Sequence, residues 1–227
     1  MLLALLLTAA NPNLPQNPAS AALPELPRPP AAFAIAADAK LMDVLRALAD
    51  STGQAILVDQ QSRTVLETTA TGLLRDTNVP PAQAWPYVQS LLAFHGAQCS
   101  YELRETPTLV AVRSPNSGRG PAGSNAVPVL LEAGQTGWLE RHPGFWVRTS
   151  IKLPNTDVRQ LVNSLRAVQT QNLESVINAG ESNVVIVTGF GSSVLQSVQL
   201  LRLIDEQSAR HPTPLGSVVP GTSGAGK

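Results

Sequence analysis

Apolar residues recur at helical spacing in four stretches of the chain, and shorter apolar runs separate these stretches. In the first, four apolar residues fall at positions i, i+3, i+4 and i+7: Leu41, Val44, Leu45 and Leu48. This is the pattern of a helix with one buried face. We predict that Asp38 caps this helix and that Gly53 ends it. Short strands are expected on either side, over residues 33–36 and 56–58.

The first half of the chain continues with further strands and a second helix. A Thr-rich strand is expected near residues 68–74, and a helix over residues 84–95 closes at Gly96. Pro86 lies close to the start of that helix, so the helix either begins there or bends in its first turn. A predicted hairpin follows, with strands over residues 98–103 and 108–113.

The second half shows the same kinds of pattern. Alternation over residues 145–153 predicts a half-buried strand, after which Asn155 or Thr156 can cap a helix. That helix repeats the helical spacing with Val158, Leu161, Val162 and Leu165. Short strands over residues 175–178 and 184–187 and a last helix from about Ser192 follow. Helices on one side of a short mixed sheet bury these faces economically, so we predict an α+β fold in each half, with two helices per sheet.

Three breaks in this pattern are rich in Pro, Gly or Ser and divide the chain.

The first ten residues, MLLALLLTAA, are too short an apolar run to span a membrane, which takes roughly 20 residues. They are typical of the apolar region of a secretory signal, although no Lys or Arg precedes them. The predicted segments are a signal peptide (1–22), an extended Pro-rich spacer (23–30), a first domain (31–113), a linker (114–126), a second domain (127–209) and a disordered tail (210–227).

Charge and cysteine content exclude several classes of protein. Lys and Arg total 16 and Asp and Glu total 16, so the chain has no basic excess to attract nucleic acid. A single cysteine, Cys99, allows no internal disulfide. The three histidines lie far apart in sequence, which disfavours a zinc site. We therefore expect no cofactor, no metal and no nucleic-acid partner.

Three glycine motifs are candidate ligand-binding sites. Residues 221–227 fit the phosphate loop G-x-x-x-x-G-K, but in the sequence given Lys227 has no Ser or Thr and no helix after it to complete the site. Gly189 and Gly191 lie between a strand and a helix, yet Val194 stands where a dinucleotide motif needs a third glycine. Residues 120–123 fit the G-x-x-G clamp of KH domains, but they fall in the linker. Tight turning of the chain explains these glycines better than a ligand does.

Catalytic chemistry has little support in the sequence. The imidazoles His95, His142 and His211 lie on a helix end or in loops, and none is paired with a nucleophile by the pattern. Cys99 alternates inward on a strand, as a buried small hydrophobe would. Four large aromatic residues are better explained by a core than by an interface: Trp85, Tyr87, Trp138 and Trp146. We expect no catalytic residue.

Both halves resemble the periplasmic N-terminal domains of secretins, specifically the protein D family of type II secretion. In the first half the resemblance rests on a helix, a Gly and an apolar strand ending in Asp (39–59), a helix end (91–96) and a closing strand (108–113). In the second it rests on a strand and capped helix (151–162), a buried strand (182–189) and a helix end (203–205). The first domain also resembles the short signalling domain of TonB-dependent transducers, and the second is KH-like in its order of strands and helices.

The resemblance implies a non-enzymatic protein of the periplasm, associated with the outer membrane through its partners, in a type II secretion or type IV pilus-like system. The implied partners are an inner-membrane platform protein, a secretin ring and exported substrate, and a homo-oligomer is left open. A secretin continues into a gate-forming β-rich region, whereas this sequence ends at Lys227, so we expect a chain without the gate. A transducer-type signalling domain and a phosphate-loop nucleotide binder remain as alternatives.

The expected partner surface is a strand edge, because small α+β sheets leave unpaired amides and carbonyls to which a partner can add a strand. The two candidate edges are the first strand and the Thr-rich stretch, and the equal alternative is that both are internal strands of the fold. Their residues are Phe33, Ala34 and Ile35, and Thr69, Thr71 and Leu73.

Export is the prediction that the N-terminal sequence generates. Mass spectrometry of the protein from its native host is expected to show a mature N-terminus between about residues 11 and 23, because small residues suited to cleavage follow the apolar run. An intact Met1 on a cytoplasmic species would contradict this expectation.

Overall fold

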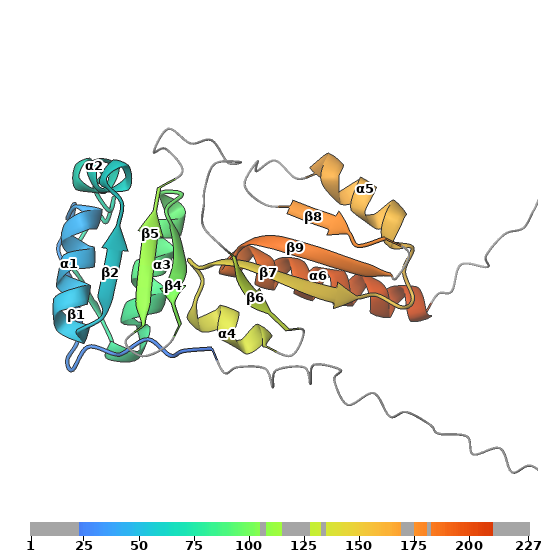
Figure 1. Ribbon diagram of the computed structural model, residues 1–227, viewed down its shortest axis with the longest axis horizontal. Helices are drawn as coiled ribbons and strands as arrows, with labels where there is room; N and C mark the ends of the chain where they lie inside the picture. Colours follow the sequence, from blue (N-terminus) through green and yellow to red (C-terminus); the bar gives the residue numbers. More distant parts are fainter. Residues whose placement is uncertain are drawn as a thin grey trace, which may run out of the picture.

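The computed structural model describes residues 23–104, 108–114, 128–132, 135–168, 175–180 and 183–210, excluding the side chains of residues 166–168. It confirms the α+β class, with helices and strands interspersed along the chain (Figure 1). We call the elements β1 to β5 the first unit and the elements β6 to α6 the second unit.

The first unit contains five strands and three helices in its described part, one helix more than predicted. In chain order they are β1 (Phe33–Ile35), α1 (Leu41–Thr52), β2 (Ala55–Val58), α2 (Gln60–Thr68), β3 (Thr77–Val79), a 3-10 turn (Pro81–Gln83), α3 (Ala84–Phe94), β4 (Gln98–Leu103) and β5 (Leu109–Arg113). The strands form two sheets instead of the single sheet expected. β1 and β3 pair antiparallel, and a separate sheet has the order β2-β5-β4, with β2 parallel and β4 antiparallel to β5.

Helix α1 matches the predicted apolar face but not the predicted cap. Leu41, Leu45 and Leu48 are buried, and Gly53 ends the helix at φ +70° while its N–H donates to the Ala49 carbonyl at 2.8 Å. Asp38 does not cap it, because Asp38 itself adopts a left-handed φ of +55° and the helix starts three residues later, at Leu41. The N-cap residue is Lys40, which makes no side-chain cap bond.

Helix α2 occupies a stretch that the sequence pattern left as a loop running into a Thr-rich strand. Asp59 caps it, because its carboxylate accepts hydrogen bonds from the Ser62 backbone N–H at 2.9 Å and from the Ser62 hydroxyl at 2.8 Å. Burial alone would raise the pKa of Asp59, but these bonds, together with the Gln61 N–H and the Arg113 charge, hold the pKa below its ordinary value. Leu66 is its one buried large apolar residue, so the helical pattern is weak in the sequence.

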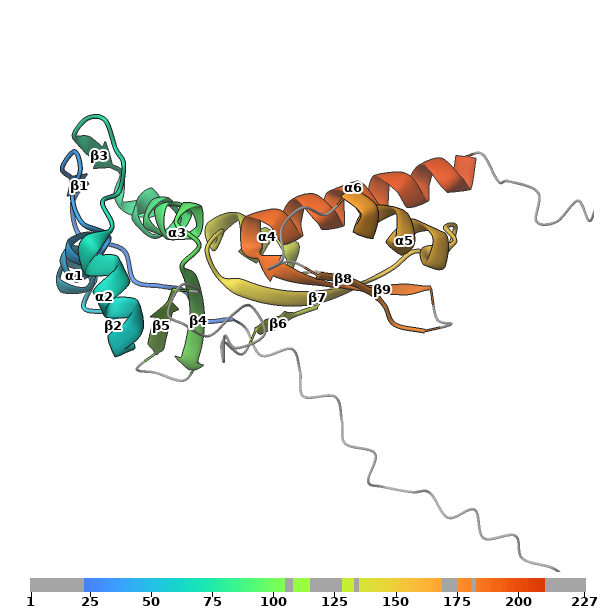
Figure 2. The same ribbon diagram turned by 90° about the horizontal axis from the view of Figure 1, so that it is seen from above.

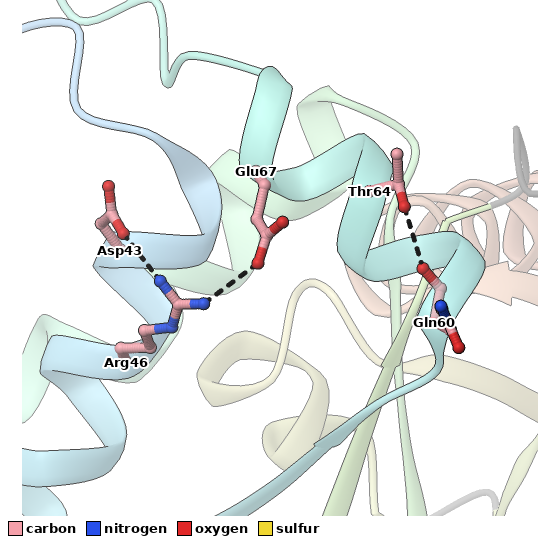
Figure 3. A network of polar contacts seen from close by, with 5 residues as sticks. All are labelled: Asp43, Arg46, Gln60, Thr64 and Glu67. Carbon is pink, nitrogen blue, oxygen red and sulfur yellow. Dashed lines mark hydrogen bonds and ion pairs between the residues drawn. The ribbon is translucent and has the colours of Figure 1, made fainter.

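A polar contact on the surface links α1 to α2 (Figure 3). Arg46 of α1 contacts Asp43 one turn earlier at 3.2 Å and Glu67 of α2 at 3.0 Å. All three side chains are largely exposed, so each pair contributes only about 0–1 kcal/mol. The buried apolar faces, not these ion pairs, hold α1 and α2 together.

Helix α3 begins at Ala84, two residues before Pro86. The 3-10 turn leads directly into Ala84, which places Pro86 in the first helical turn. In that turn the backbone N–H groups need no partner within the helix, so a proline there removes no hydrogen bond.

The second unit folds four strands into one sheet of order β6-β7-β9-β8, in which β6 is parallel to β7 and the other pairs are antiparallel. Its described elements are β6 (Val129–Leu131), α4 (Thr136–Arg141), β7 (Trp146–Lys152), α5 (Val158–Val168), β8 (Ser175–Asn178), β9 (Val184–Phe190) and α6 (Gly191–Arg210). Helix α4 was not predicted. Helices α5 and α6 lie on the same side of the sheet (Figure 2).

The alternation predicted for β7 is confirmed, because Val147, Thr149 and Ile151 are buried under the helices. The cap of α5 is a correction: Asp157, not Asn155 or Thr156, accepts from the N–H groups of the first turn. Asn155 and Thr156 instead bind the carboxylate of Asp205 on α6 at 2.8–3.0 Å. This network fixes the loop before α5 against α6.

The Pro-rich residues 23–30 take no helix or strand, as expected, but the expectation that they stand apart from the fold is wrong. We call them the N-terminal strap. Leu26 is buried, the Pro27 carbonyl accepts from Trp85 Nε1 at 2.8 Å, and the Pro24 carbonyl accepts from the Tyr101 hydroxyl at 3.0 Å. Prolines have no N–H to satisfy, so an extended proline segment can pack on a core using its carbonyls alone.

In the described part of the chain, no helix is both long enough and apolar enough to cross a membrane. Residues 211–227 and 115–127, which include two of the three glycine motifs and most of the predicted linker and tail, lie outside the described residues.

The turn from β9 into α6 generates a stability prediction. A Cβ on Gly191 would lie 2.3 Å from the His142 carbonyl oxygen, a backbone atom that cannot move away cheaply. Gly191→Ala is therefore expected to lower the free energy of unfolding by about 1–3 kcal/mol in urea titrations.

Gly137 of α4 is the matched control, because a Cβ there meets nothing within 4 Å. Gly137→Ala is expected to leave stability unchanged or raise it by up to about 1 kcal/mol. Equal stability of the two variants would contradict the close approach at Gly191.

Candidate interaction surfaces

The β1–β3 ribbon carries the first of the two predicted edges. Its register pairs Phe33 with Val79, Ala34 with Asn78 and Ile35 with Thr77. Phe33 and Ile35 are buried, whereas Ala34 is exposed. No other described strand pairs with β1 or β3, so each keeps one unpaired edge within the described residues. The sequence thus placed Phe33, Ala34 and Ile35 on an edge strand, and contact of these residues with a partner stays a prediction.

The second predicted edge is not a strand. Residues 68–74 begin at the last residue of α2 and continue as a loop. The Thr69 carbonyl accepts from the Leu41 N–H at 3.0 Å, and the Thr71 N–H donates to the Ala39 carbonyl at 2.8 Å. The Leu73 carbonyl accepts from the Asp38 N–H at 3.2 Å. These backbone groups already have internal partners, so Thr69, Thr71 and Leu73 do not form the free edge expected of them.

The two units meet at a junction built around Phe145. Phe145 is fully buried, and its backbone bridges to Cys99 of β4, whose N–H donates to the Gly144 carbonyl at 2.9 Å. Its ring lies 4.7 Å from Tyr101 of the first unit and 5.3 Å from Trp138 of α4, measured between ring centroids. The main hydrophobic core runs through this junction, from β1 to α6, without a break between the units.

Two contacts reinforce the junction. Helix α3 approaches so closely that a Cβ on Gly144 would lie 2.5 Å from the Gln89 carbonyl oxygen. The N-terminal strap reaches across both units, because Glu25 pairs with Arg141 of α4 while Pro24 and Pro27 contact the first unit. The strap therefore ties the first unit to the second.

The buried titratable groups of the junction belong to its packing. Cys99 is fully buried, which raises the pKa of its thiol to about 12 and confirms it as a small hydrophobe. His142 packs between Trp138, at a centroid distance of 4.1 Å, and Phe145, at 5.4 Å. Burial, assisted by the neighbouring Arg141 charge and opposed by Glu25, lowers the pKa of His142 to about 4.

The aromatic and glycine residues that the sequence analysis singled out also have packing roles. Trp85, Trp138 and Trp146 are buried, as a core role predicts, and Tyr87 is half-buried. Gly191 donates its N–H to the Phe145 carbonyl at 2.9 Å, so it turns the chain tightly into α6 at the junction. His95 ends α3 with its Nε2 atom 3.2 Å from the Thr71 carbonyl oxygen. His211 lies outside the described residues.

One surface was not anticipated: the face of the second unit's sheet opposite α5 and α6, which we call the open face. The strand registers place on it, in neighbouring rows, Leu130 beside Arg148 and Thr188, Ser150 beside Ile186 and Ile177, and Lys152 beside Val184. The outward positions of β7 were visible in the sequence as the other half of its alternation. The neighbours on β6, β8 and β9 were not, because they depend on the order of strands in the sheet.

Comparisons with known proteins identify the fold. No protein-family model matches the chain, and no curated protein sequence matches it. The chain does match a chain in the type II secretion outer membrane complex of Klebsiella pneumoniae, which contains PulD, PulS and the PulC HR domain. The TM-score is 0.50 and the identity 15%, over 74% of this chain and 26% of that chain. This protein therefore has the fold of secretin N-terminal domains, and it spans about a quarter of the matched chain's length.

Two further matches have TM-scores too low to carry an argument. The GspC–GspD complex of enterotoxigenic Escherichia coli matches with a TM-score of 0.27 and 16% identity, over 78% of this chain and 99% of that chain. A structure of the Salmonella SPI-1 injectisome that includes the InvG N0N1 domains matches with a TM-score of 0.28 and 11% identity, over 81% of this chain and 99% of that chain.

The buried imidazole at the junction generates a prediction about pH. His142 has a folded-state pKa of about 4 against 6.5 for an ordinary histidine, so between these values the unfolded chain binds a proton that the folded chain does not. Stability is therefore expected to fall as the pH drops from about 6.5 towards 4, by up to about 1.4 kcal/mol per pH unit.

His142→Phe keeps an aromatic ring at the junction and removes the titrating group. Urea unfolding of both proteins at pH values from 7 to 4.5 should show a smaller loss of stability in the variant. Identical pH slopes would show that His142 is not the group responsible.

Proposed function

We propose that this chain is a non-enzymatic interaction protein of a type II secretion or type IV pilus-like apparatus, acting in the periplasm. The observation that carries the proposal is the secretin N-domain fold over 74% of the chain, which spans both units. The apolar N-terminal run, typical of a secretory signal, supports export.

The partners follow from the same likeness. The Klebsiella complex with the matching fold contains the PulC HR domain and PulS alongside PulD. By analogy this chain docks an inner-membrane platform protein, and it works beside a secretin ring and the substrates the ring exports. A transducer-type signalling domain is the weaker alternative, because it would account for the first unit alone.

The β1–β3 ribbon is the surface we propose for the platform protein. A partner strand can pair with the free edge of β1 or of β3, where backbone groups supply the affinity. The ribbon is only three residues long on each strand, and Ala34 and Asn78 are exposed at its centre. Short edges of this kind resist self-aggregation yet still accept a strand of matching length.

Proline substitutions on the two strands test this docking mode. Ala34→Pro removes an amide from β1, and Asn78→Pro removes one from β3, at directly paired positions. We expect the variant on the docking edge to reduce recovery of the platform protein at least tenfold when the tagged chain is purified from the native envelope fraction. The variant on the opposite edge is expected to retain it.

Thermal unfolding provides the folding control, since both variants must still melt cooperatively to be informative. Thr71 is unsuitable for this test because its N–H has an internal partner. Unchanged recovery in both folded variants would rule out the ribbon as the docking edge, while leaving the wider role in secretion open to test through other surfaces.

A further inference from the structure

The open face of the second unit's sheet is apolar in part, and apart from the contact with α3 at one end no described helix covers it (Figure 2). Leu130 of β6 is 63% exposed and Ile177 of β8 is 45% exposed, and both belong to the largest exposed apolar side chains of the described residues. Ile186 and Val184 of β9 lie between the edge strands on the same face and are partly exposed. These apolar side chains lie on β6, β8 and β9, while β7, which separates β9 from β6, contributes Arg148, Ser150 and Lys152 between them.

At its end nearest the first unit the open face carries an aromatic pair. Trp146 and Phe190 pair across β7 and β9 on the open face, with ring centroids 5.6 Å apart, and Ala93 of α3 packs against them. Trp146 and Phe190 are buried, so this end of the face is closed by packing within the chain, and the surface left for a partner lies over residues 130, 148–152, 177 and 184–186.

The charges on the open face are all positive. Arg148 and Lys152 are exposed on β7, and the residues that the register places on this face include no Asp or Glu. Neither cation forms an ion pair with a described residue, including the exposed Glu132 that follows β6. Arg148 is held in place because its Nε donates to the Thr188 hydroxyl at 3.0 Å, which leaves its two terminal nitrogens available to a ligand.

We propose that the open face binds an acidic amphipathic segment of a protein partner, with apolar side chains on Ile177, Ile186 and Leu130 and carboxylates paired with Arg148 and Lys152. Complementary charge selects this occupant. Two cations, each worth about 1 kcal/mol near an anionic lipid surface, are too few for stable membrane binding. A second copy fits less well, because the exposed side of α6 mixes Arg202 and Arg210 with Glu206.

This surface is independent of the β1–β3 ribbon, and the inference stands or fails separately from docking there. The ribbon lies in the first unit and offers backbone groups, whereas the open face lies in the second unit and offers side chains. A partner could therefore engage one surface while the other is free.

A defined peptide tests the inference on the full chain. The probe is the nonapeptide Ser-Ile-Ser-Glu-Ser-Ile-Ser-Glu-Ser, which in extended form presents Ile and Glu on one face, and two matched peptides replace every Glu by Lys or every Ile by Ser. Fluorescence anisotropy at 50 mM salt is expected to show at least tenfold tighter binding of the acidic amphipathic peptide than of either control. Amide shifts in NMR spectra are expected on β6 to β9.

A charge-reversal variant locates the contact. Arg148→Glu with Lys152→Glu is expected to weaken the acidic peptide at least tenfold, and Leu130→Ser at least threefold. Arg63→Glu with Arg75→Glu is the matched control, because it changes the net charge equally at exposed positions in the first unit and is expected to change binding less than twofold. Unfolding curves must remain cooperative in every variant.

Several results would overturn the inference. These are equal binding of the acidic and basic peptides, equal loss of binding in the two charge-reversal variants, or shifts confined to α5 and α6. Self-association that Leu130→Ser abolishes would assign the face to a second copy. Binding to vesicles of anionic phosphatidylglycerol that only the Arg148 and Lys152 variant loses would assign it to a membrane.

Discussion

The packing of Phe145 between the two units is the constraint on which the rest of the structure depends. Its ring must contact Tyr101 from one unit and Trp138 from the other, while its backbone bridges to Cys99. Such close approach leaves no room for side chains on the flanking backbone, so glycine stands at position 144 against Gln89 and at position 191 against His142. These glycines are explained by geometry and need no ligand. One continuous core then forms where the sequence pattern suggested two.

The N-terminal strap, although rich in proline, also packs against the two units at the junction. A proline-rich stretch cannot form helix or sheet readily, yet its carbonyls accept bonds from Trp85 and Tyr101, and Leu26 fills a place in the core. Its Glu25 meets Arg141 on the far side of the junction. The strap therefore contributes to fixing the units relative to each other, and the expected site of signal cleavage would lie directly before it.

A junction of this kind gives the proposed function a physical basis. The β1–β3 ribbon belongs to the first unit and the open face to the second, so a shared core would hold the two surfaces at a set separation. Backbone edges favour strand addition, and the open face favours apolar contact steered by charge. Different partners could then be held in a fixed arrangement, as an envelope-spanning apparatus would require. Protonation of His142 would weaken the junction only in acid, at pH values below the ordinary histidine pKa of 6.5.

The sequence alone determined the elements whose apolar residues follow one strong period. Leu41 to Leu48 specified α1, and the alternation from Val147 to Ile151 specified β7, because burial on one side of a regular element leaves a periodic trace. It also placed Phe33, Ala34 and Ile35 on a strand with a free edge. It missed α2, which is built on the Asp59 cap and a single buried leucine. It also predicted a strand at Thr69 and Thr71, whose backbone groups are in fact bonded to Leu41 and Ala39 at the start of α1.

Only the tertiary structure decided which strands are neighbours. The strand order in turn decided which residues share the open face. Leu130 and Ile177 come from strands far apart in the chain, and they share a face with Arg148 only because the sheet has the order β6-β7-β9-β8. In the same way, Cys99 and Phe145 meet across the junction. Such pairings depend on shape and contact between distant segments, and local periodicity carries no record of them.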